Sequence, residues 1–97
     1  MGNHQYRRML DRLPNEMKEL MKHVNHECLV LTHNAGSMGW SVDFQIKKTN
    51  LSLIYDRGLL AVKKEPGKAE KNLLPKNKDM FSITIEDLAK EVNNEFA

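Results

Sequence analysis

Apolar residues recur along this chain with two different periods, and the change between them separates a helical part from an extended part. Four of them follow the spacing i, i+3, i+4 and i+7, which is one face of a helix: Met17, Leu20, Met21 and Val24. Proline suits the first turn of a helix and breaks its interior, so Pro14 marks the start. The pattern therefore predicts a helix from about Pro14 to Val24.

From Glu27 onward the period shortens to two, which is typical of extended strands. In residues 40–47 polar residues alternate with four apolar ones, Trp40, Val42, Phe44 and Ile46. One face of this strand is therefore expected in the core and the other in solvent. Further strands are expected at residues 28–31, 51–55 and 59–63, with a loop at 34–39 and turns at 49–50 and 56–58.

The strand at residues 28–31 is an unbroken apolar run, unlike the alternating strand that follows it. Such runs are typical of strands that are buried on both faces. Because short loops join the four strands, neighbours in sequence are expected to pair antiparallel.

The C-terminal part of the chain carries signals for the start of a helix. A brief extended piece is expected at residues 81–83, and Thr84 then has the side chain of an N-cap. Asp87 stands at the capping-box position, and Ile83 and Leu88 stand at the two positions of a hydrophobic staple. The apolar stripe of this helix is Ile85, Leu88, Val92 and Phe96.

The order of these elements is helix, four strands, long loop and helix. We therefore expect an α+β fold, a two-layer sandwich in which an antiparallel four-stranded meander packs against an N-terminal and a C-terminal helix. The 97 residues are expected to form a single domain, 1–97, because a chain of this length supports one core. Residues 1–13, with a helical turn within 3–12, are expected to be a loose N-terminal segment, and residues 64–79 an exposed lysine-rich loop.

Composition narrows the class of protein. Apolar residues make up 40% of the chain and charged residues 29%, values typical of a soluble globular domain and not of a disordered one. No apolar run follows the polar, basic N-terminus, so neither a signal peptide nor a membrane span is expected. One cysteine cannot form an internal disulfide, which fits a reducing compartment, and we expect a cytoplasmic protein.

Residues 23–33 hold three of the four histidines and the only cysteine, an arrangement that suggests a metal site. Zinc needs three or four ligands that converge on one point. Cys28 and His33 are five residues apart on the expected strand, so they should point to opposite faces about 16 Å apart. This leaves His23, His26 and Cys28 as candidate ligands. The alternative interpretation is structural, with histidines near a helix C-terminus and a small buried thiol.

No group of residues predicts catalysis. A pair of Cys28 with a histidine lacks a third residue to orient it. The glycine-bounded residues 36–39 lack the lysine ending and the following helix of a phosphate loop. No catalytic or cofactor-binding residue is therefore assigned, an enzyme is not expected, and no motif identifies a family.

Charge is segregated along the chain. Residues 47–78 carry nine basic and three acidic side chains, whereas residues 79–97 carry one basic and five acidic ones. The basic stretch suits phosphates but has few aromatic residues for base stacking, and lysines on edges also keep a sheet from pairing with other chains. The residues expected to contact a partner are Lys47, Lys48, Arg57, Lys63, Lys64, Lys68 and Lys71.

Three carboxylates of the last expected helix, Asp87, Glu91 and Glu95, are spaced i, i+4 and i+8 and form an acidic stripe. We interpret the stripe as a solvated outer face. The other interpretation is an electrostatic docking surface.

The sequence favours a small non-catalytic protein-binding module, of the regulator, adaptor, immunity or phage-accessory type. It would act through contact with another protein or with a second copy as a homodimer. The alternative is a nucleic-acid-binding protein that uses the basic face of residues 47–78. Neither a membrane nor a cofactor is expected to take part.

Overall fold

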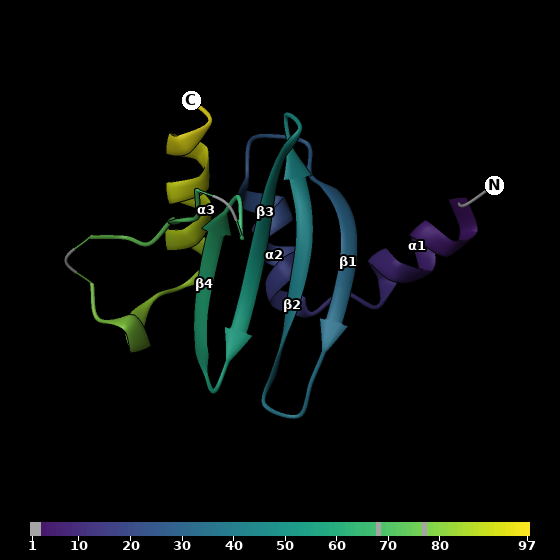
Figure 1. Ribbon diagram of the computed structural model, residues 1–97, viewed down its shortest axis with the longest axis horizontal. Helices are drawn as coiled ribbons and strands as arrows, with labels where there is room; N and C mark the ends of the chain where they lie inside the picture. The colour runs from purple at the N-terminus through teal and green to yellow at the C-terminus, as the bar shows by residue number, and fades with distance from the viewer. Residues whose placement is uncertain (1–2, 68, 77) are drawn as a thin grey trace.

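The computed structural model describes residues 3–67, 69–76 and 78–97. In these residues the chain forms three α-helices, a short 3-10 helix and one five-stranded sheet (Figure 1). The helices are α1 (Asn3–Asp11), α2 (Asn15–His23), α3 (Ile85–Glu95) and the 3-10 helix η1 (Met80–Ser82). The strands are β1 (Leu29–Ala35), β2 (Gly39–Ile46), β3 (Thr49–Asp56), β4 (Leu59–Lys64) and β5 (Lys71–Asn72).

The expected α+β fold with an antiparallel meander is confirmed, but the sheet has five strands and not four. The strands lie in the order β1-β2-β3-β4-β5, and each pairs antiparallel with the next. The fifth strand comes from the segment predicted as an exposed loop. There the Leu73 N–H donates to the Val62 carbonyl at 2.8 Å, and the Leu73 side chain is buried. Burial of a leucine contributes about 1.5–3 kcal/mol, which favours folding this segment back onto the sheet.

One face of the sheet is covered by helices. In Figure 1, α2 lies behind β2 and β3, and α3 lies beside α2 near β4. Val42, Phe44 and Ile46 of β2 are fully buried, as the alternation predicts. Trp40, the fourth apolar residue of β2, is partly buried and stacks on Tyr55 with ring centroids 5.6 Å apart. The other large core side chains come from both layers: Met17, Leu20, Leu51, Leu53, Val62, Leu88 and Val92.

None of the helices formed by the described residues lies on the second face of the sheet, which we call the open face (Figure 1). It is not wholly exposed, since Ser52 at its centre is buried. Much of this face is polar. One row of neighbours across the strands is Thr32, Asp43, Ser52, Lys63 and Asn72. The Thr32 hydroxyl donates to the Asp43 carboxylate at 2.9 Å, so part of this row is already hydrogen-bonded.

β1 does not follow the prediction of a strand that is buried on both faces. Only Val30 is buried, whereas Leu29 is 50% exposed and Leu31 is 41% exposed. β1 is an edge strand, and a bulge between Val30 and Thr32 adds one residue to it. An apolar run alone shows neither the edge nor the bulge, and the two leucines remain accessible.

α1 lies alongside the free edge of β1 (Figure 1). The Val30 N–H donates to the Tyr6 hydroxyl at 3.1 Å, and Tyr6, Met9 and Leu10 pack against the core. An edge strand leaves backbone groups without a strand partner. Here a side chain from α1 satisfies one of them.

The β2–β3 turn lies two residues earlier than predicted. Lys47 and Lys48 form it, and residues 49–50 belong to β3. The reason is the register: pairing the buried positions of β2 with those of β3 leaves only these two lysines between the paired ends. The turn predicted at residues 56–58 is confirmed, with Arg57–Gly58 at its centre.

The predicted start of α3 is confirmed. The Thr84 hydroxyl accepts from the Asp87 N–H at 3.2 Å, and the Asp87 carboxylate accepts from the Thr84 N–H at 3.0 Å, which completes a capping box. The extended piece predicted at residues 81–83 is wrong, because most of that segment belongs to η1. The Asp79 carboxylate caps η1 by accepting from the Phe81 N–H.

Asn93 of α3 forms hydrogen bonds with the segment that connects α2 to β1. Its side-chain amide donates to the His23 carbonyl at 3.1 Å, and its side-chain oxygen accepts from the Asn25 N–H at 2.7 Å. The carbonyls of the last helical turn need partners from outside the helix. α3 therefore completes the C-terminal end of α2, which lies 70 residues earlier in the sequence.

Candidate functional site

The basic residues that were predicted to contact a partner do not form one surface. Lys47 and Lys48 lie at one end of β3, and Arg57 lies at the other. β3 has eight residues, so these two ends are about 25 Å apart. Lys63 and Lys64 are neighbours on β4 and therefore point to opposite faces of the sheet.

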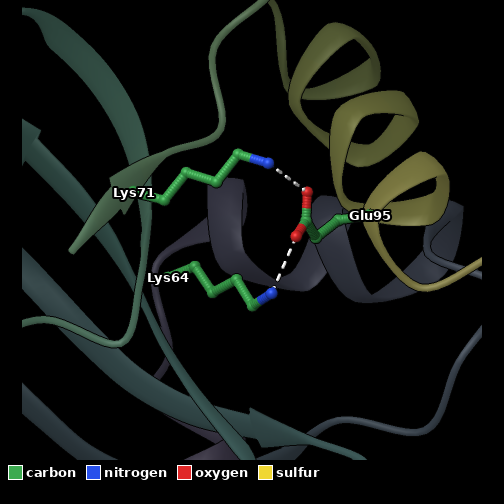
Figure 2. A network of polar contacts seen from close by, with 3 residues as sticks. All are labelled: Lys64, Lys71 and Glu95. Atoms are coloured by element: carbon green, nitrogen blue, oxygen red, sulfur yellow. Dashed lines mark hydrogen bonds and ion pairs between the residues drawn. The ribbon is translucent and has the colours of Figure 1, made fainter. Parts of the chain in front are cut away.

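Lys64 and Lys71 are held by the same carboxylate. Figure 2 shows Lys64 and Lys71 reaching toward the two oxygens of Glu95 on α3. Lys64 Nζ lies 2.7 Å from Glu95 Oε2, and Lys71 Nζ lies 2.9 Å from Glu95 Oε1. The hydrogen bond from Lys64, followed by that from Lys71, lowers the pKa of Glu95, and the same bond to Glu95 raises the pKa of Lys64.

A second carboxylate of α3, that of Asp87, forms an ion pair with Lys78 in the segment between β5 and η1. Lys78 Nζ lies 2.6 Å from Asp87 Oδ2. This hydrogen bond, together with the one from the Thr84 N–H, lowers the pKa of Asp87 to about 2. The interpretation of the acidic stripe as a solvated face is therefore wrong for Asp87 and Glu95, which dock lysines of the protein itself.

Folding thus brings the basic middle of the sequence against its acidic end. Lys63 also has a carboxylate close by, since its Nζ lies 3.3 Å from Glu70 Oε2. Lys68, another predicted contact residue, lies outside the described residues. Much of the segregated charge is therefore neutralised within the molecule.

Lys47 and Lys48 differ from these lysines. Both are exposed, and within the described part of the chain neither has a carboxylate at ion-pair distance. Lys47 Nζ donates to the Phe96 carbonyl at the end of α3, at a long 3.4 Å. The two lysines border an open pocket of about 490 Å³, whose other lining residues are His26, Glu27, Leu29 and Gln45.

Leu31 lies two residues after Leu29 on β1 and lines a second hollow. Leu29 and Gln45 pair across β1 and β2, and the Gln45 amide donates to the Asn50 side chain at 2.8 Å. Beyond this amide pair lies a smaller hollow of about 160 Å³, lined by Leu31, Asp43, Asn50, Leu51 and Pro66. We define the corner patch, where β1 meets the β2–β3 turn, as Leu29, Leu31, Gln45, Lys47 and Lys48.

The candidate metal ligands each have a different neighbour. His23 Nε2 lies 3.6 Å from a Glu19 carboxylate oxygen, and the His26 ring packs edge-on against Phe96. The Cys28 thiol lies 3.7 Å from the His26 carbonyl oxygen, and burial raises the pKa of this thiol to about 11. Among the described residues, no three histidine, cysteine, aspartate or glutamate side chains are grouped to hold a metal ion.

The bulge in β1 also changes the side to which His33 points. His33 pairs with Val42, which is in the core, so His33 faces the helical layer. Cys28 packs against the core as well. The prediction that Cys28 and His33 point to opposite faces is therefore wrong, because the bulge adds one residue to the strand.

Sequence reasoning found part of the corner patch. It named Lys47 and Lys48 as contact residues but placed Leu29 and Leu31 inside the sheet. The order of the strands was the available signal, because the first strand of a meander lies at the edge of the sheet.

Comparison with known proteins adds no family: no protein-family model, curated protein or solved structure matches the chain. No helix within residues 3–67, 69–76 and 78–97 is long and apolar enough to span a bilayer.

Proposed function

We propose that this chain is a small non-catalytic protein-binding module and that the corner patch is its contact surface. The observation that carries the proposal is the exposure of Leu29 and Leu31 on the open face of an edge strand. Apolar side chains that are accessible side by side, with polar groups around them, are typical of protein–protein contact sites. The lysines of the β2–β3 turn supply the polar rim.

The role is that of a regulator, an adaptor, or an immunity or phage-accessory protein, and the partner is another protein or a second copy of this chain. A cytoplasmic location belongs to the same proposal. Cys28 is a free cysteine, and a raised thiol pKa suits an inert residue in a reducing compartment.

Nucleic-acid binding by residues 47–78 has less support. Binding to a phosphate backbone draws its free energy from lysines and arginines that release counterions. Four lysines of this segment already have carboxylate partners, which phosphates would have to displace: Lys63, Lys64, Lys71 and Lys78.

The experiment is affinity purification of the tagged protein from its native host after cross-linking, with quantification by mass spectrometry. The wild type is compared with the double variant Leu29→Ser/Leu31→Ser. Phe81→Ser is the matched control, because Phe81 is 74% exposed but lies on η1, which contacts β4, three strands away from β1 in the sheet.

We expect a partner to be enriched with the wild type and with Phe81→Ser, and its recovery to fall at least about tenfold with the double variant. Urea unfolding of each variant verifies that it is folded. Recovery of no partner, together with cross-linking that shows only monomer, would contradict the proposal.

A further inference from the structure

The backbone of the Lys47–Lys48 turn is unusual for the residues that form it. Lys47 has φ of 50° and Lys48 has φ of 67°, so both lie in the left-handed region. Two-residue hairpin turns of this kind favour Asn-Gly, because glycine has no β-carbon and asparagine bonds to its own backbone. Lysine has neither advantage, so local turn chemistry does not explain the pair.

The electrostatic surroundings of this turn are also distinct. The Nζ atoms of Lys64, Lys71 and Lys78 each lie within 2.9 Å of a carboxylate oxygen, whereas neither Lys47 nor Lys48 forms an ion pair within the described residues. Glu27 is the one carboxylate that lines the same pocket, beside two lysines. The pocket therefore has an excess of positive charge.

The pocket combines this charge with apolar surface. Leu29 forms part of its lining and is half exposed. The neighbouring Gln45 amide donates one of its N–H groups to Asn50. A volume of about 490 Å³ accommodates a few side chains of a partner. The matching ligand presents an apolar side chain next to a negative charge.

We propose that the corner patch binds an acidic segment of a partner protein, with an apolar side chain against Leu29 and carboxylates at Lys47 and Lys48. The inference rests on the proposed function and adds the chemistry of the partner. Complementary charge at the rim of an apolar contact steers association and selects the partner. An acidic protein segment supplies both parts, whereas a nucleic acid supplies charge without an aliphatic side chain.

The test selects random short peptides, displayed on phage, against the immobilised full chain. We expect enrichment of sequences with aspartate or glutamate beside leucine, isoleucine, valine or phenylalanine. A selected peptide is then synthesised with a fluorescent label, and its binding is measured by anisotropy at low and at moderate salt.

The double variant Lys47→Gln/Lys48→Gln should weaken binding of the labelled peptide by at least about tenfold and remove most of its salt dependence. Replacing the peptide's acidic residues by glutamine and asparagine should have a similar effect. Arg57→Gln is the matched control, because Arg57 is also an exposed cation at positive φ but lies at the opposite end of β3. It should leave the affinity unchanged.

The outcomes separate this inference from the proposed function. The selection could yield apolar peptides without acidic residues, which the lysine variant binds as tightly as the wild type and Leu29→Ser/Leu31→Ser does not bind. That result would overturn the inference and leave the proposed function standing. Failure to enrich any acidic sequence overturns the inference as well. A third outcome is that short single-stranded DNA displaces the peptide at moderate salt and that the lysine variant no longer binds this DNA. That result would assign the two lysines to nucleic-acid binding and overturn the inference.

Discussion

The β2–β3 and β3–β4 hairpins close with two-residue turns of similar backbone geometry but different chemistry. Lys47–Lys48 has φ of 50° and 67°, and Arg57–Gly58 has φ of 52° and 86°. The second turn has glycine at the position with the larger φ. In the first turn both residues carry a β-carbon, and the left-handed conformation costs such a residue about 1–2 kcal/mol.

The difference shows that strand pairing, and not turn sequence, fixes the geometry of the first hairpin. Every residue of β2 pairs with a residue of β3, from Gly39 with Asp56 to Ile46 with Thr49. A shift of register by one residue would move Val42 and Phe44 out of the core. The lysines therefore adopt the only turn that this register allows, at a loss of stability.

The largest effect should come from placing a β-carbon in the second turn. Gly58→Ala should lower the free energy of unfolding by about 1–2 kcal/mol, because Gly58 has φ of 86°. No atom lies within 4 Å of the added β-carbon, so the loss is conformational and not steric. Urea unfolding monitors it. Gly36→Ala is the control, since Gly36 lacks a positive φ, and an equal loss there would contradict the explanation.

The next largest effect on stability should come from the reverse change, the removal of a β-carbon from the first turn. Lys48→Gly should raise the free energy of unfolding by about 1 kcal/mol, since it removes the β-carbon from a residue with φ of 67°. The same variant should weaken binding of the acidic peptide. Stability from urea unfolding and affinity from anisotropy would then change in opposite directions, and a variant that loses both would argue against strain at this turn.

A smaller effect is expected for the ion pair between Lys78 and Asp87, because a lysine of this kind, unlike those of the first turn, has a carboxylate partner. The pKa of Asp87 is lowered from 3.8 to about 2, so its stabilising contribution is present above the ordinary value and is lost as pH falls through the window between them. The urea midpoint of the wild type should therefore decrease across this window. Asp87→Asn keeps an oxygen for the cap but removes the charge, and its midpoint should change less with pH. Equal pH profiles would show that the charge of Asp87 contributes nothing to stability.

The smallest effect is expected for the charges of the first turn. Lys47→Gln/Lys48→Gln should leave the free energy of unfolding unchanged within about 0.5 kcal/mol. Glutamine keeps the β-carbon, and in the described residues neither lysine has a carboxylate to lose. Calorimetry or urea unfolding measures this, and a loss as large as that of Gly58→Ala would mean that these charges stabilise the fold.

Local signals in the sequence predicted the parts of the fold that local physics determines. The alternation in residues 40–47 requires only that one face of a single strand is covered. The cap at Thr84 requires only hydrogen bonds to a residue three positions later. The turn at residues 47–48 could not be placed in this way. Its position depends on the register between two strands, which is a property of the pair.

Features that join distant residues were missed for the same reason. β5 forms because Leu73 reaches the core beside Val62, and neither residue indicates this alone. The docking of Lys64 and Lys71 onto Glu95 joins residues 31 and 24 positions apart. Charge segregation was visible in the sequence, but whether it serves a partner or the protein itself depends on the fold. Leu29 was misassigned because an apolar run looks alike at the edge and in the middle of a sheet.

The hydrogen bonds of Asn93 have a consequence for biosynthesis. A nascent chain emerges N-terminus first, so α2 and the five strands are made before the residue that completes the end of α2. During that interval Met17 and Leu20 lack the helix that packs beside them, and apolar surface is open to chaperones and to other nascent chains. The contacts between α2 and α3 form only after α3 has left the ribosome, so the last helix to be made is also the one that covers this part of the core.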